Sequence, residues 1–130
     1  MKADFPRRFI HRQETEPFEK ERVMPEKLEA AMQELQRECP SLMEPFGLLH
    51  QAAVEDGVLS AKTKKLMMIA VSAATRCEPC LRLHVKGALE LGATREEILE
   101  AAGVAILMGG GPTAAYCALY LLDELQRRKK

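Results

Sequence analysis

The chain has 130 residues, enough for one domain with a core of its own, and 47% of them are apolar. Its 19 Lys and Arg residues balance 19 Asp and Glu residues, so it lacks the basic excess of a nucleic-acid-binding protein. The first 24 residues lack the apolar core of a signal peptide. The longest apolar runs, Leu66–Ala74 and Ile98–Met108, are shorter than the roughly 18 to 20 residues of a membrane-spanning helix. We therefore expect a cytoplasmic protein with neither nucleic-acid nor membrane partners.

Residues 1–24 show no sustained apolar period and contain Pro6 and Pro17. We interpret this segment as an extended N-terminal arm whose aromatic side chains pack on a partner subunit. From residue 25 onward the pattern becomes amphipathic, because apolar residues recur at positions 28, 31, 32 and 35. Residues 25–130 are therefore predicted to form a single all-helical domain.

Start and stop signals divide this domain into about six helices, and no segment alternates with the period of two that is typical of strands. The predicted helices cover residues 25–39, 41–57, 60–74, 77–91, 94–108 and 112–125. We expect Ser41, Ser60 and Thr94 to cap three of them, with Glu44 and Glu97 completing two capping boxes. The third and fifth helices are apolar on every side over most of their length. Such helices predict a homo-oligomer with helix-mediated interfaces.

The sequence gathers its reactive side chains in the fourth predicted helix, as Cys77, Cys80 and His84. Residues three and four apart lie on one helix face, so both sulfurs and the imidazole are expected to be neighbours. A helix N-terminus lowers the pKa of a thiol, and helical Cα atoms three residues apart are within disulfide reach. His84 either removes the proton of Cys80 as a general base or stabilises the thiolate as an imidazolium. This pattern predicts cleavage of an O–O or S–S bond by one thiol and resolution by the other.

The cysteine motif has two other interpretations, a structural zinc site and plain core packing. A CxxC pair is often half of a structural zinc site, but the chain has no second CxxC or paired histidines, and Cys39, Cys117 and His50 are isolated in the sequence. Free cysteines are also frequently plain core residues. The polar neighbours of Cys77 and Cys80 argue against a fully apolar site. We therefore predict no metal ligands, and we assign no role to His50.

Five stretches carry a family resemblance. They are Leu59–Leu66, the Cys77–His84 motif, Gly87–Ala88, Gly92–Ile98 and Met108–Pro112. Together, over about residues 42–125, they resemble the AhpD-like branch of the carboxymuconolactone decarboxylase superfamily. The resemblance implies an all-helical subunit, a homotrimer or homohexamer, and reduction of hydroperoxides by an external dithiol such as a lipoyl group, without a bound cofactor. It also implies that Cys80 attacks the peroxide, Cys77 resolves the product, and His84 belongs to a proton relay.

One position departs from the family pattern. The family relay has a glutamate twelve residues before the first cysteine of the motif, whereas this chain has Lys65 there. A lysine favours a nearby thiolate by its charge, but it accepts no proton while it is protonated. Glu78 lies inside the motif and is an alternative proton acceptor. We expect this change to affect peroxide reduction more than simple disulfide exchange.

The site residues predicted from the sequence are Cys80, Cys77, His84 and Lys65, in a thiol-dependent oxidoreductase that acts on a hydroperoxide or a disulfide. One alternative is a decarboxylase of the wider superfamily, in which Lys65 or Arg82 binds a carboxylated lactone and the thiols are dispensable. A third is a non-enzymatic oligomeric interaction protein in which the thiols only pack.

Overall fold

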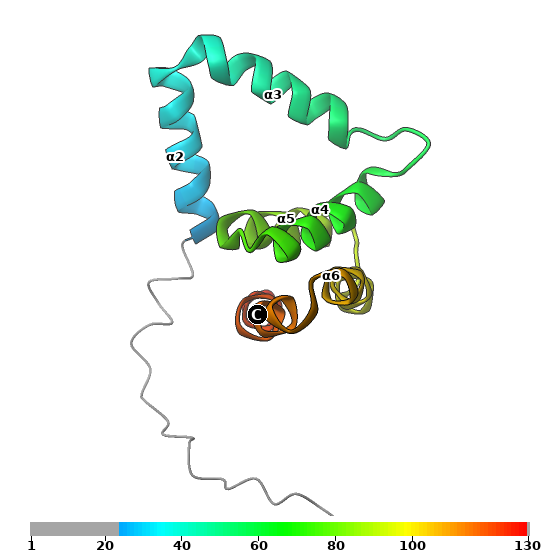
Figure 1. The fold of residues 1–130 in the computed structure, drawn as a ribbon. Helices are drawn as coiled ribbons and strands as arrows, with labels where there is room; N and C mark the ends of the chain where they lie inside the picture. The colour runs from blue at the N-terminus through cyan, green and yellow to red at the C-terminus, as the bar shows by residue number, and fades with distance from the viewer. Residues whose placement is uncertain (1–23, 130) are drawn as a thin grey trace, which may run out of the picture.

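The computed structural model describes residues 24–129, and these residues are helical without any strand, as predicted. The predicted arm therefore lies outside the described residues, apart from Met24. The elements are α2 (Met24–Glu38), α3 (Pro40–Val54), α4 (Ala61–Thr75), α5 (Glu78–Glu90), α6 (Arg95–Tyr116), the π-helix η1 (Cys117–Leu121) and α7 (Leu122–Arg127). In Figure 1, α4 and α5 lie side by side, α6 and the C-terminal helices pack beneath them, and α2 and α3 project on the other side.

The core lies between the α4–α5 pair and the C-terminal helices. Its fully or almost fully buried apolar side chains are Ile69, Ala73, Leu81, Val85, Ala88, Ile98, Ala102, Ala105, Leu121 and Leu125. Four of these are alanines, whose small side chains let helix backbones approach closely. Because α4 packs on both α5 and α6, it fixes the loop that joins α4 to the cysteine motif.

Two of the three predicted N-caps are confirmed. The Ser60 hydroxyl accepts a hydrogen bond from the Thr63 N–H at 3.1 Å. Thr94 accepts one from the Glu97 N–H at 3.1 Å, and the Glu97 carboxylate accepts one from the Thr94 N–H at 2.8 Å, which completes a capping box. Both serve the same purpose, because the first turn of a helix has N–H groups without intrahelical partners.

The predicted capping box at Ser41 is wrong. Helix α3 begins one residue earlier, at Pro40, and Cys39 occupies the N-cap position without a side-chain hydrogen bond. Proline is favoured in the first helical position because its missing N–H would have had no partner there. The same helix ends at Val54, before Gly57, where we had placed its end.

The predicted break at Gly109–Pro112 is present, but the helix resumes directly after it. Gly110 has φ 68° and ψ −152°, a conformation that a residue with a side chain rarely adopts, and it kinks α6. Residues Arg95–Arg127 are therefore one nearly continuous helical run, long and apolar enough by composition to cross a membrane. We expected no apolar segment long enough to span a membrane, and this holds only when the runs Leu66–Ala74 and Ile98–Met108 are considered separately. One face of this run belongs to the core, and 22% of its most apolar stretch is buried.

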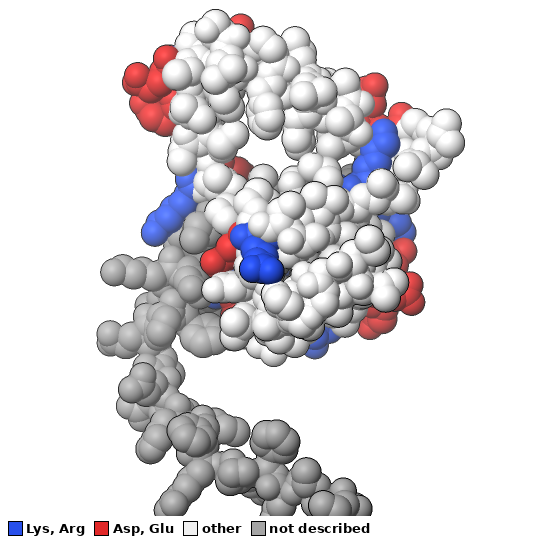
Figure 2. Space-filling view, viewed as in Figure 1, with Lys and Arg blue, Asp and Glu red and all other residues white. Residues whose placement is uncertain are grey.

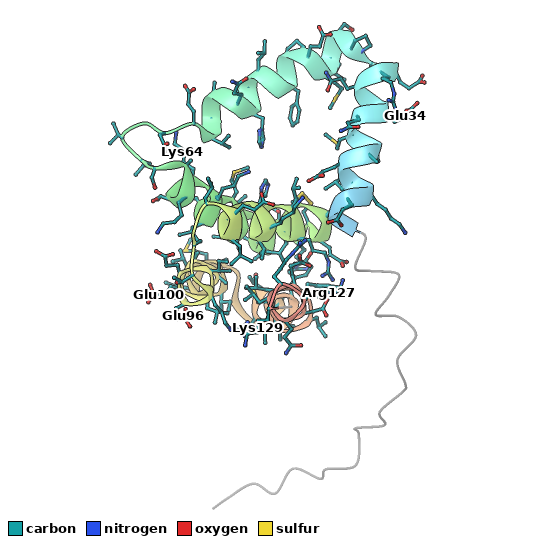
Figure 3. All side chains as sticks on the ribbon, turned by 180° about the vertical axis from the view of Figure 1, so that it is seen from behind. Glu34, Lys64, Glu96, Glu100, Arg127 and Lys129 are labelled. Carbon is teal, nitrogen blue, oxygen red and sulfur yellow. A yellow bond between two sulfur atoms is a disulfide. The ribbon has the colours of Figure 1, made fainter. Side chains whose placement is uncertain are left out.

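Helix α3 buries none of its side chains within the chain. Leu42, Phe46 and Leu49, which form an apolar stripe along one face of this helix, are 68%, 52% and 65% exposed. Helices α4 and α6, predicted to be apolar on every side, also expose apolar side chains in the single subunit, including Val71 and Leu107. Figure 2 shows broad uncharged surface over α3 and over the lower body, with a hollow between them. Acidic side chains such as Glu96 and Glu100 point outward from the edge of α6 (Figure 3).

Candidate active site

The two cysteines of the motif are joined by a disulfide at the start of α5. Cys77 is the N-cap residue of the helix, Cys80 is its third residue, and their Cα atoms are 5.3 Å apart. Arg76 adopts the left-handed conformation (φ 56°, ψ 44°) that ends α4, and the Cys77 N–H donates to the Ser72 carbonyl at 3.0 Å. Both cysteines are half-buried. A tight turn anchored on α4 thus holds the pair in the first turn of α5, where unpaired N–H groups favour negative charge.

His84 lies one turn after Cys80 and is half-buried. Its Nδ1 atom is buried and has no hydrogen-bond partner within residues 24–129. Burial, followed by the charges of Lys65 and His50, lowers the pKa of His84 to about 4. The imidazole is therefore neutral at pH 7 with the disulfide closed. Of the two predicted roles, this state favours the general base over the imidazolium.

Lys65 reaches this site from α4. Its side chain crosses α5 at Gly87, where its Cε atom is 3.3 Å from the point that a Cβ atom would occupy. Cys80, His84 and Gly87 follow one another at intervals of four and three residues, so Lys65 lies along the helix face that carries the thiol and the imidazole. Burial lowers the pKa of Lys65, and the charge of Glu90 partly opposes this effect. Within residues 24–129, Lys65 forms no ion pair or hydrogen bond.

His50, to which the sequence analysis assigned no role, is the site residue that it missed. It belongs to α3, and its positive form is disfavoured by burial and by Lys65, which together lower its pKa. It lines a groove of about 250 Å³ in the angle between α2 and α3. A signal was present in the sequence, because His50 follows Phe46 by four residues and is thus a polar side chain on the apolar stripe of α3.

Arg82 occupies the opposite side of α5 and is only 1% exposed. Its guanidinium donates to the carboxylates of Glu78 at 2.9 Å, Asp123 at 3.0 Å and Glu124 at 2.9 Å. These bonds tie the first turn of α5 to the C-terminal helix. Arg82 is therefore unavailable to bind a substrate anion. The Glu78 carboxylate is engaged by Arg82, so it is not free to accept a proton from a thiol. Both alternatives raised from the sequence are corrected by this cluster.

A pocket of about 300 Å³ opens beside Lys65. It is lined by Glu29, Lys65, Leu83, Lys86, Gly87, Glu90 and Leu91. Leu83 lies one turn after Cys80, so the pocket extends along α5 from that turn toward Leu91. Lys86 is paired with Glu29 at 2.9 Å, whereas Lys65 has no such partner among residues 24–129. In the described part of the chain, no group of three or more His, Cys, Asp or Glu side chains is arranged to hold a metal ion.

The fold and the cysteine motif place this chain in a known family. The profile of the carboxymuconolactone decarboxylase family matches residues 40–123, so the chain belongs to that family. Among its relatives, uncharacterised protein 4 of the cox locus of Paracoccus denitrificans is 41% identical over 101 residues, 76% of this chain and 91% of the relative. An uncharacterised protein of Cupriavidus necator is 39% identical over 88 residues, 66% of this chain and 78% of the relative.

Solved structures show the same fold. A carboxymuconolactone decarboxylase family protein from Legionella pneumophila is 37% identical, with a TM-score of 0.77, over 84% of this chain and 97% of its own. A family protein from Thermotoga maritima, for which an antioxidative role has been suggested, is 30% identical, with a TM-score of 0.69. The match covers 79% of this chain and 91% of that protein.

Proposed function

We propose that this protein is an AhpD-like thiol oxidoreductase that reduces hydroperoxides or disulfides through Cys77 and Cys80. The observation that carries the proposal is a disulfide across the first turn of α5, next to a half-buried imidazole that is neutral at pH 7. Cys80 is assigned as the nucleophile because His84 lies one turn below it. Cys77, at the N-cap, is assigned as the resolving thiol.

The proposed cycle balances with a hydroperoxide as oxidant and a dithiol as reductant. Neutral His84 takes the proton of Cys80, and the thiolate attacks the O–O bond to give a sulfenic acid and an alcohol, whose proton comes from the imidazolium. Cys77 then attacks the sulfur of Cys80, which forms the disulfide and releases water. An external dithiol, of the lipoyl type, returns the pair to two thiols and becomes a disulfide. The protein needs no bound cofactor for these steps.

Lys65 is proposed to assist this cycle by charge. Its ammonium lies along the same face of α5 and favours a thiolate at Cys80 over a thiol. It also keeps His84 neutral and thus ready to accept the proton. The lysine therefore performs a different task from the carboxylate that the family relay has at this position.

The proposal also includes assembly of the subunit into a homotrimer or homohexamer. The apolar stripe of α3 and the outer face of α6 are too exposed for an isolated subunit, with Leu42 at 68% and Leu107 at 82%. Contact with other copies of the chain would cover both surfaces in the reducing cytosol, where we place the protein. Light scattering of the full chain should give a mass of three or six subunits, and a monomer would contradict this part of the proposal.

The test of the activity uses the two kinds of cysteine in the chain. With hydroperoxide and a dithiol present, Cys80→Ser should lose peroxide consumption, because it removes the thiol that lies one turn before His84. Cys39→Ser is the matched control, since Cys39 is a free, exposed thiol at the start of α3. Peroxide consumption by Cys80→Ser at the parent rate would refute the assignment. Release of carbon dioxide from a carboxylated lactone by a variant without Cys77 and Cys80 would instead support the decarboxylase alternative.

A further inference from the structure

Among the basic residues at the start of α4, Lys65 is the one without an ion pair or hydrogen bond to the described residues. Lys62 donates to Glu97 at 2.9 Å, and Lys64 donates to the Glu55 carbonyl at 2.7 Å. Lys65 is half-buried, and within residues 24–129 it forms neither an ion pair nor a hydrogen bond. A half-buried ammonium without a counter-ion is costly, and an anion bound beside it would remove that cost.

The position of Lys65 also sets the distance between an anion bound to it and the thiol of Cys80. Gly87, which the lysine crosses, lies seven residues after Cys80 on the same helix face. Seven residues of α-helix span roughly 10 Å at about 1.5 Å per residue. The pocket of about 300 Å³ is lined by Lys65, Leu83 and Gly87, so it runs along α5 from one turn after Cys80. A small molecule with two reactive ends about this far apart would match the spacing between the thiol and the ammonium.

We infer that the site selects substrates that carry a carboxylate a few bonds away from the disulfide or peroxide bond, and that Lys65 binds this carboxylate. The inference rests on the proposed function and names its substrate class. The other charges that line the pocket fit it. Glu29 and Lys86 neutralise each other at 2.9 Å. Glu90, the remaining carboxylate, is exposed and lies outside ion-pair distance of Lys65.

The reaction with a carboxylated disulfide balances without a further reagent. The Cys80 thiolate attacks one sulfur of the substrate, which forms a mixed disulfide and expels a thiolate that takes up a proton. Cys77 gives up its proton and attacks the sulfur of Cys80, which releases the second substrate thiol. The two protein thiols are oxidised to a disulfide, and the substrate disulfide is reduced to two thiols.

The experiment compares 4,4′-dithiodibutyrate with its diamide, which has the same S–S bond without the charges. Second-order rate constants for oxidation of the reduced full chain are measured with both compounds by rapid quenching and mass spectrometry. For each variant, the rate constant for the acid is divided by that for the amide. This ratio removes differences in the intrinsic reactivity of the protein thiol, because both compounds have the same S–S bond. We expect Lys65→Gln to lower this ratio about tenfold, in line with loss of one charge-assisted hydrogen bond.

Two control variants separate specificity from damage to the fold. Lys65→Arg keeps the charge and should keep the ratio, whereas Lys64→Gln removes the neighbouring charge and should leave it unchanged. A ratio that is equal in the parent and in Lys65→Gln overturns the inference and leaves the proposed function intact. No oxidation of the parent by either disulfide or by a hydroperoxide overturns the proposed function and this inference with it.

Discussion

Acid should destabilise the oxidised protein through His84. The pKa of this residue is about 4 in the folded chain and about 6.5 in the unfolded chain, so between these values only the unfolded chain binds the proton. The contribution of His84 to the free energy of unfolding therefore has its full value above pH 6.5, and it is lost as the pH falls toward 4. One proton is equivalent to ~1.4 kcal/mol per pH unit, which gives at most ~2.7 kcal/mol between pH 6.5 and 4.5. Because His84 is half-buried and partly screened, we expect about half of this amount.

The assay is urea unfolding of the disulfide-closed protein at pH 6.5, 5.5 and 4.5. The loss of stability on acidification should be smaller by about 1 kcal/mol in His84→Gln than in the parent. Carboxylates that titrate at low pH are the same in both proteins, so their effect cancels. His50→Gln is the comparison variant, because the pKa of His50 is also lowered but this residue is more exposed. Equal pH dependence in the parent and in His84→Gln, or an imidazole that titrates near pH 6.5 by NMR, would refute the reasoning.

Three further predictions concern the scaffold around the site. Arg82→Ala should lower the free energy of unfolding by about 2 to 3 kcal/mol, because it removes a buried cation that bonds three carboxylates, of which Asp123 and Glu124 keep Arg127 and Arg128 as partners. Arg37→Ala, at an exposed ion pair, should cost less than about 1 kcal/mol in the same urea titration. Ser60→Ala should cost about 1 kcal/mol in thermal or urea unfolding through loss of the α4 N-cap. Gly87→Ala should change stability little but displace Lys65, whose Cε atom lies 3.3 Å from the new methyl position. It should therefore reduce the acid-to-amide rate ratio, and an unchanged ratio would show that Lys65 does not bind the carboxylate from this position.

Sequence reasoning succeeded where the determining interactions are local. The caps at Ser60 and Thr94 and the placement of the cysteine motif at a helix start depend on neighbours within four residues. It failed at Ser41, where another local preference won, because Pro40 is favoured in the first position of a helix. The all-helical fold followed from the same local signals.

The site itself could be predicted only in part, because its remaining members come from other elements. Arg82 looked free in the sequence, yet its partners Asp123 and Glu124 lie more than 40 residues later in the chain. His50 looked isolated, and only the tertiary fold, in which α3 contacts α4, brings it within electrostatic range of His84. Such partners are set by packing, which spacing along the sequence does not reveal.

The most direct test of the account is the fate of the two thiols after one equivalent of hydroperoxide. The reduced full chain is mixed with the peroxide, alkylated, digested and analysed by mass spectrometry. We predict that the peptide containing Cys77 and Cys80 loses two hydrogen atoms and resists alkylation, while Cys39 and Cys117 remain free thiols. Full alkylation of Cys77 and Cys80 after the peroxide has been consumed would contradict the claim that this pair carries the electrons.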